Sequence, residues 1–130
     1  MKITQELLDD LTAKAMASPR LRMNMDLRNS PEDQSQRMLN AIEPGSEVPI
    51  HRHRLSSETV VCLRGRLVEE YYDEAGSVVD SIELTPGGPV EALNIPAGQW
   101  HTVRSLESGT VILEVKDGPY APLAEEDVLR

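Results

Sequence analysis

Three histidines and one glutamate are the side chains of this sequence best suited to chemistry. His51 and His53 are two residues apart, so an extended strand would place both imidazoles on the same face. Four residues separate His53 from Glu58, the length of a hairpin connection, and we expect Glu58 to return on the neighbouring strand opposite the histidines. His101, the third and last histidine, follows a turn that contains proline and glycine. This spacing is consistent with one site shared by all four side chains.

Three neutral imidazoles and one carboxylate form a good ligand set for a divalent transition metal. The set suits Zn, Fe, Ni, Mn or Co, and it leaves one or two coordination positions open for water or substrate. Taken singly, each histidine is more commonly an ordinary polar residue of a surface or a loop. The metal site is favoured because every histidine of the chain falls where a single geometry would use it. The expected cofactor is therefore one divalent metal ion (Zn, Fe, Ni or Mn).

The elements that position these residues follow from the apolar pattern. Residues 4–17 predict a helix that Thr4 caps and Ser18-Pro19 stops, because apolar side chains recur at helical spacing. Residues 20–35 are polar and are predicted to form a connecting loop. About eight short strands are then predicted between turn residues, at 37–43, 47–53, 58–64, 66–72, 77–84, 90–95, 101–106 and 110–116. Their regular spacing favours a sandwich or barrel over a parallel sheet.

Composition excludes several classes of partner. The 130 residues suit a single domain, and the net charge of -9 argues against binding to a phosphate backbone, so no nucleic-acid partner is expected. Cys62 is the only cysteine, which rules out an intrachain disulfide, and it is interpreted as a small core residue. The first ten residues lack the apolar core of a signal peptide, and no apolar run approaches the length of a membrane span. We therefore expect a cytoplasmic protein with no membrane partner.

Two motifs resemble those of the cupin superfamily. The order Gly45, five residues, His51-x-His53, four residues, Glu58, six residues, Gly65 matches the first cupin motif throughout. The second motif is represented by its core, Pro96-x-Gly98-x-x-His101, with Val90 in place of the usual opening glycine and Ser105 in place of a frequent closing asparagine. Neither departure affects a ligand position.

The cupin resemblance implies an all-β fold, a double-stranded β-helix (jelly-roll barrel), here with a short N-terminal α-helix. It also implies a metal bound inside the barrel by His51, His53, Glu58 and His101. The expected organisation is one domain: an N-terminal helix and loop packed on the barrel (1–35), the barrel itself (36–120) and an acidic tail (121–130) that frays unless it docks. A homodimer is also expected from the resemblance.

Within the cupins, the sequence most resembles the WbuC-type cupin fold metalloproteins, at residues 18–22, 36–41, 44–45, 51–53, 63–66, 95–102 and 114–120. Members of that family are often encoded near bacterial surface-polysaccharide genes, and their activity is not settled. The resemblance implies a small-molecule ligand or substrate, such as a sugar or nucleotide-sugar intermediate, and an isomerase- or epimerase-like reaction. A non-catalytic, metal-dependent binding module and an Fe(II) dioxygenase-type cupin remain open alternatives.

Other polar residues are candidates for acting on a bound molecule. Tyr71 and Tyr72 are adjacent, so one of them faces inward on a strand, and both are catalytic candidates for moving protons, with core packing as the plainer alternative. Arg20, Arg22 and Arg37 would suit an anionic substrate, since guanidinium groups bind carboxylate or phosphate. Structural ion pairing with the many acidic residues is the competing role of each arginine.

Overall fold

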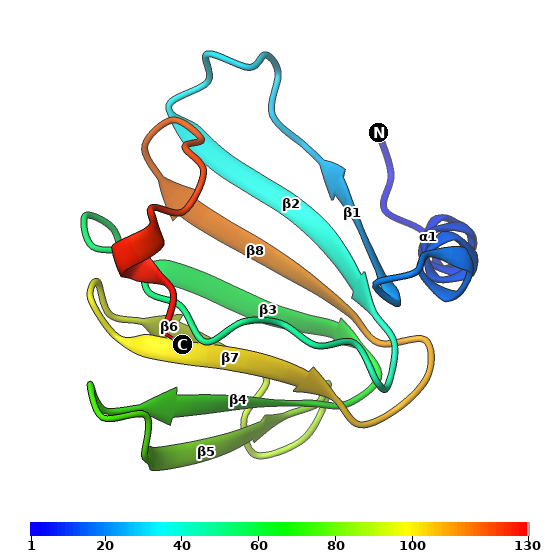
Figure 1. Cartoon of the computed structure of the whole chain (residues 1–130). Helices are drawn as coiled ribbons and strands as arrows, with labels where there is room; N and C mark the ends of the chain where they lie inside the picture. The colour runs from blue at the N-terminus through cyan, green and yellow to red at the C-terminus, as the bar shows by residue number, and fades with distance from the viewer. Residues whose placement is uncertain (130) are drawn as a thin grey trace.

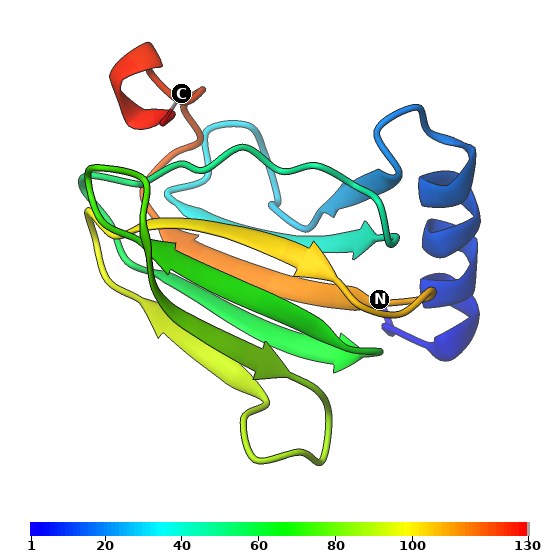
Figure 2. The ribbon, with the colours of Figure 1, turned by 60° about the horizontal axis from the view of Figure 1, so that its bottom comes forward.

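Two antiparallel sheets face each other, and a single long helix lies against one of them (Figures 1 and 2). The structure is a computed structural model that describes residues 1–129. Its elements are α1 (Gln5–Ala17), β1 (Arg22–Asp26), β2 (Ser35–Ile42), β3 (Glu58–Arg64), β4 (Leu67–Tyr72), β5 (Val78–Leu84), β6 (Ala92–Ile95), β7 (Trp100–Ser105), β8 (Val111–Asp117) and the short 3-10 helix η1 (Glu125–Asp127). The larger sheet has the order β1-β2-β8-β3-β6 and the smaller one β5-β4-β7. This arrangement confirms the predicted all-β jelly-roll class.

Two apolar clusters hold these layers together. The interior cluster fills the space between the sheets and contains Ile42, Val60, Cys62, Leu67, Leu84, Ile95, Val103 and Ile112, so Cys62 is a core residue as predicted. A second cluster joins α1 to the outer face of the larger sheet through Leu8, Leu11, Ala15, Leu39, Ala41 and Val111. The larger sheet is therefore buried on both faces where α1 covers it.

The predicted helix over 4–17 is confirmed, with Thr4 as its N-cap. The hydroxyl of Thr4 accepts a hydrogen bond from the backbone N–H of Leu7, which satisfies one of the free donors at the helix start. The helix ends at Ala17, directly before Ser18 and Pro19. No helix within residues 1–129 combines the length and the apolar character needed to cross a membrane.

Two parts of the strand prediction are wrong. Strand β1 lies inside the predicted loop 20–35, because its short Met23/Met25 alternation packs under α1 while β1 pairs with β2. The predicted strand 47–53 is not a strand, and only His51 forms isolated bridges, one with His101 and one with Val128. Pro49 has no N–H to donate, which interrupts any longer ladder. The expected hairpin to Glu58 is also absent, since β3 pairs with β6 and β8.

The C-terminal segment does not fray within the described residues. After η1, Val128 bridges His51, and the N–H of Leu129 donates to the carbonyl of Ile50 at 2.8 Å. Asp127 receives hydrogen bonds from Arg52 and Arg54, which anchors η1 beside the segment that carries the histidines. Figure 1 shows η1, coloured red, at the end of the barrel away from α1.

Candidate metal centre

The barrel interior changes from apolar to polar along its strands. On β8 the inward positions run from Ile112 in the interior cluster to Glu114 and Lys116, which line a cavity. Strands β3 and β4 also turn polar toward this cavity, through Glu58 and Glu69. Charged groups from three strands therefore meet at one end of the barrel, next to the apolar interior cluster.

His51 and His101 are held side by side by their backbones. Each donates its N–H to the carbonyl of the other, at 3.0 and 2.9 Å, and the ring centroids are 4.4 Å apart. The Nδ1 of His51 donates to the carbonyl of Pro49 at 2.8 Å, and the Nδ1 of His101 to the carbonyl of Gln99 at 2.9 Å. Since a carbonyl can only accept, both rings carry their hydrogen on Nδ1, and each Nε2 keeps a free lone pair.

Glu58 and His53 complete the cluster. The Oε2 of Glu58 lies 3.0 Å from the Nε2 of His53 and 3.8 Å from the Nε2 of His101. One ring nitrogen from each of the three histidines lies within 4.8 Å of the others. The structure therefore brings together all four side chains that the sequence singled out. These side chains come from both sheets: Glu58 lies on the larger sheet and His101 on the smaller.

Burial and mutual proximity tune the charges of this cluster. Burial, together with the nearby His101, lowers the pKa of His51 to about 4, and burial also lowers the pKa of His101. Burial alone would raise the pKa of Glu58, but the hydrogen bond from His53 and the adjacent imidazoles hold it below its usual value. The lowered pKa values of His51, His101 and Glu58 favour two neutral imidazoles beside an ionised carboxylate, the protonation states that metal ligands require.

This donor set fits a divalent transition metal. Imidazole nitrogens and a carboxylate oxygen suit Zn, Fe, Ni or Mn, and the fixed Nδ1 hydrogen bonds orient two of the rings in the way that metal sites commonly use. With four protein ligands, such an ion retains the capacity to take a further ligand from the cavity.

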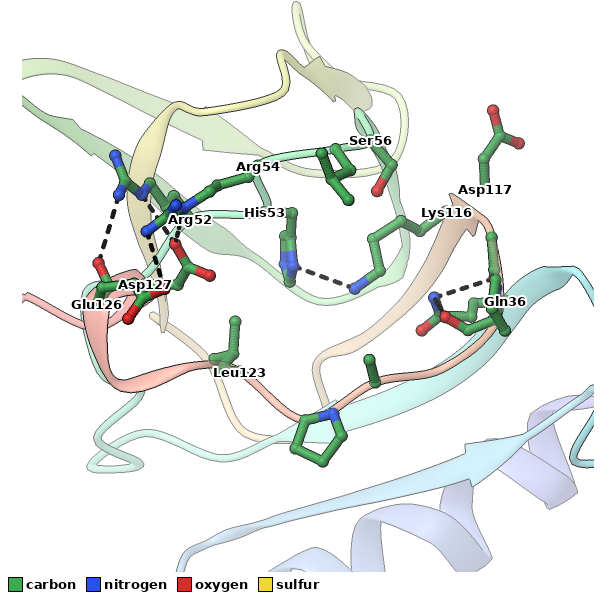
Figure 3. A pocket seen from close by; sticks show the side chains of 15 residues that line it. Gln36, Arg52, His53, Arg54, Ser56, Lys116, Asp117, Leu123, Glu126 and Asp127 are labelled. Atoms are coloured by element: carbon green, nitrogen blue, oxygen red, sulfur yellow. Dashed lines mark hydrogen bonds and ion pairs between the residues drawn. The ribbon is translucent and has the colours of Figure 1, made fainter.

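Two cavities meet at the cluster. The inner cavity has a volume of about 410 Å³ and is lined by all four cluster side chains and by Asn40, Glu69, Glu114 and Lys116. The outer cavity, of about 620 Å³, is lined by Arg52, Arg54 and residues of the C-terminal segment (Figure 3). His53, Lys116, Gln36 and residues 121–123 line both. The C-terminal segment therefore forms part of the wall between the candidate site and solvent.

Three inward charged residues were missed by the sequence reasoning. Glu69 is only 2% exposed, and its Oε2 has no hydrogen-bond partner among the described residues. Burial, with the charges of Glu58 and Glu114, raises the pKa of Glu69 well above its ordinary value. Glu114 is partly accessible from the cavity, yet the surrounding protein desolvates it and, with Glu58, raises its pKa to about 8. Lys116 lies opposite Glu58 on the neighbouring strand.

The two tyrosine candidates, Tyr71 and Tyr72, point to opposite faces of β4, as adjacent residues of a strand do. Tyr71 lies opposite His101 and packs against the interior cluster. Its pKa is raised, first by burial and then by the charge of Glu69. Tyr72 has the opposite parity and lies opposite Trp100. Of the two, Tyr71 is the one near the candidate site.

Two of the three arginine candidates, Arg22 and Arg37, are engaged in structural bonds. Arg22 donates to Ser46 and to the carbonyl of Glu47, and Arg37 donates to Asp33 and to the carbonyl of Ser35. Both border the inner cavity. Arg20 borders neither the inner nor the outer cavity. The positive charge that contacts the cluster of histidines and Glu58 comes instead from Lys116, whose Nζ is 3.3 Å from the Nδ1 of His53.

One family model matches the sequence. Its description is "Domain of unknown function (DUF6016)", and it matches residues 3–84, which is more than half of the chain. No curated protein matches.

Solved structures with the same architecture include cupins. The capsular polysaccharide assembling protein CapF from Staphylococcus aureus is 19% identical with a TM-score of 0.68, over 85% of this chain and 32% of CapF. Oxalate decarboxylase from Bacillus subtilis is 20% identical with a TM-score of 0.60, over 84% of this chain and 27% of that protein. The cupin domain of Cnp3 from Schizosaccharomyces pombe is 12% identical with a TM-score of 0.58, over 76% of this chain and 61% of that one. The fold is that of a cupin, and the chain spans about a third of the length of CapF.

Proposed function

We propose that this chain, which belongs to the DUF6016 family and has the cupin fold, binds one divalent metal ion and uses that ion to bind a small polar molecule. His51, His53, His101 and Glu58 would hold the ion. The observation that carries the proposal is the convergence of three histidine nitrogens within 4.8 Å beside the Glu58 carboxylate, at the wall of a cavity. The ion would supply positive charge to polarise a carbonyl or hydroxyl of the bound molecule.

The chain's own residues have defined tasks in this proposal. The backbone bridge between His51 and His101 fixes two ligands before any ion arrives. The inner cavity, about 410 Å³, falls in the size range of small-molecule sites. The segment 121–123 lines part of this cavity.

An isomerase- or epimerase-like reaction is the finer form of the proposal. Such reactions move protons, and Glu69 and Glu114, whose pKa values are raised, together with Tyr71, are proton carriers near the ligand cluster. A substrate from surface-polysaccharide metabolism is suggested by the WbuC-type sequence segments, with CapF as a protein of the same fold that is described as assembling capsular polysaccharide. The likeness to CapF supports the fold alone.

Metal-dependent turnover tests the catalytic form. Protein loaded with Zn²⁺, Mn²⁺ or Fe²⁺ would be incubated with nucleotide sugars and with small keto and hydroxy acids, and the products would be followed by mass spectrometry and NMR. The Fe²⁺ form would be loaded without oxygen and then assayed both with and without it. Turnover that stops with a chelator and resumes with metal supports an enzyme. Tight metal-dependent binding with no turnover of any compound contradicts it and favours the binding module. Oxygen consumption confined to the Fe²⁺ form would instead favour a dioxygenase-type cupin.

A homodimer remains part of the proposal on the cupin resemblance alone. The apolar stripe of α1 and Leu63, which otherwise need cover, are packed within the chain. Light scattering at micromolar concentration would show twice the monomer mass of 14.4 kDa if the proposal holds, and the monomer mass if it does not.

A further inference from the structure

Lys116 is a cavity cation whose ammonium group is not held by a carboxylate. Arg37 pairs with Asp33, and Arg22 is bound to the Ser46 hydroxyl and a backbone carbonyl. Within residues 1–129, the ammonium group of Lys116 makes no ion pair with a carboxylate, and its hydrogen-bond partner is the Nδ1 of His53 at 3.3 Å. Lys116 lines both the inner and the outer cavity, and Figure 3 shows it in the outer one. A partly buried positive charge therefore faces the place where a ligand would enter.

Metal coordination by His53 would release Lys116 from its present partner. In the structure Lys116 donates to Nδ1 of His53, so the ring hydrogen sits on Nε2 and is shared with Glu58 at 3.0 Å. Coordination through Nε2 requires a free lone pair there, and the ring hydrogen then moves to Nδ1. Two donors would face each other, and the ammonium group would lose its acceptor. An anion bound in the cavity would replace that acceptor.

The walls of the inner cavity offer further unpaired polar atoms. Within the described residues, Oε2 of Glu69 and Oδ1 of Asn40 are buried and have no hydrogen-bond partner. Such atoms are costly unless a ligand or water satisfies them. Hydroxyl groups of a ligand would donate to both. Burial raises the pKa of Glu69 and raises that of Glu114 to about 8, which disfavours the charged form of both carboxyls and weakens their repulsion of an anion.

We propose that the inner cavity binds a small hydroxylated carboxylate, with its carboxylate group between the metal position and Lys116 and its hydroxyl groups against Asn40 and Glu69. This inference rests on the proposed metal site and adds the chemical class of the ligand. Lys116 is the residue that selects for the negative charge, and Asn40 and Glu69 select for hydroxyl groups.

Three six-carbon probes separate the parts of this proposal. D-gluconate has a carboxylate and hydroxyl groups, sorbitol has the hydroxyl groups without the carboxylate, and hexanoate has the carboxylate without hydroxyl groups. Each would be titrated calorimetrically into the full chain with Zn²⁺ in slight excess. We expect gluconate to bind more tightly than either of the others. Equal binding of sorbitol overturns the carboxylate assignment, and equal binding of hexanoate overturns the hydroxyl assignment.

Substitutions then assign the charge to Lys116. A charge-assisted hydrogen bond is worth roughly 10- to 100-fold in affinity, so Lys116→Gln should weaken gluconate binding by about that factor and leave sorbitol binding unchanged. Lys116→Arg keeps the charge and should bind gluconate more tightly than Lys116→Gln. Lys14→Gln, on the exposed surface of α1 and outside both cavities, is the matched control and should behave as wild type.

Metal content measured on the same samples distinguishes the two proposals. Zn²⁺-loaded Lys116→Gln that binds gluconate as tightly as wild type overturns the role of Lys116 and leaves the metal site standing. Zn²⁺-loaded wild type that binds none of the three probes overturns the ligand class. Wild type that takes up no Zn²⁺ overturns the proposed metal site itself, whatever gluconate does.

Discussion

The backbones of His51 and His101 exchange two hydrogen bonds, N–H of each to C=O of the other, at 3.0 and 2.9 Å. These residues are fifty positions apart in sequence, and His51 lies in a segment that forms no strand of its own. The bridge fixes the backbones of both residues, and the hydrogen bonds from Nδ1 to the carbonyls of Pro49 and Gln99 orient the two rings. The fold therefore positions these two proposed ligands without a bound ion.

Replacing His51 with alanine should abolish stabilisation by metal and preserve the fold. The bridge to His101 needs no side chain, so the far-ultraviolet circular dichroism should match wild type. Zn²⁺ at about 100 times its dissociation constant stabilises a folded protein by about 2.7 kcal/mol. Thermal unfolding with Zn²⁺ and with a chelator should thus differ for wild type and nearly coincide for His51→Ala. An equal Zn²⁺-induced shift in both proteins would contradict the assignment of His51.

Metal-free protein should lose stability on acidification between pH 6.5 and about 4. The pKa of His51 is lowered to about 4 and that of His101 is also lowered, whereas a histidine of the unfolded chain has a pKa of about 6.5. In this window the unfolded chain binds more protons than the folded one, so the free energy of unfolding falls as pH falls, by at most about 1.4 kcal/mol per pH unit for each histidine. Urea unfolding at pH 7.5, 6 and 5 measures the slope. His51→Ala should show a shallower slope, and an unchanged slope would refute this explanation.

Replacing Glu114 with glutamine should increase the free energy of unfolding, relative to wild type, by a larger amount as pH rises. The pKa of Glu114 is raised to about 8 in the fold by burial and by Glu58. Between its unfolded pKa of about 4.3 and pH 8 the folded protein holds the extra proton, so this group destabilises the fold increasingly as pH increases. The stability difference between Glu114→Gln and wild type, measured by urea unfolding at pH 5, 7 and 9, should grow in favour of the variant. Glu74→Gln, at an exposed turn, is the control, and a pH-independent difference for Glu114→Gln would contradict the prediction.

Replacing Asp127 with asparagine should loosen the C-terminal segment. Asp127 accepts hydrogen bonds from the Nε of Arg52 at 3.0 Å and of Arg54 at 2.6 Å, and Arg52 also stacks over Trp100. Amide hydrogen exchange of residues 121–129 should be several-fold faster in Asp127→Asn. Glu126→Gln removes a more exposed, 3.4 Å pair with Arg54 and should have little effect. Equal exchange in both variants would show that Asp127 does not anchor the segment.

The positions of the proposed ligands could be predicted from the sequence because motif spacing is local information. The predicted strand pairing between the segment of His51 and the strand of Glu58 was nevertheless wrong. His51 does not reach Glu58 through a hairpin, but sits beside His101 on β7, while Glu58 belongs to the other sheet. Spacing along the chain indicates which residues can share a site. It does not specify which strands pair to bring those residues together.

Two of the three inward charged residues, Glu114 and Lys116, could not be predicted because the larger sheet that carries them is buried on both faces. On β8, Val111 and Leu113 pack toward α1, and the alternate positions Ile112, Glu114 and Lys116 face the interior. An alternation of apolar and polar residues normally places the apolar set inside the barrel. Here α1 covers that set from outside, so the pattern points to the wrong face for Glu114 and Lys116.

Elemental analysis of the purified protein tests the metal site most directly. Wild type, dialysed without chelator, should carry about one divalent ion per chain, while His53→Ala, His101→Ala and Glu58→Gln should each carry far less. Lys14→Gln, remote from the cluster, should equal wild type. Wild type with well under one ion of every kind, even after incubation with Zn²⁺, Mn²⁺ or Fe²⁺, would contradict the proposal. So would ligand variants that retain the metal as fully as wild type.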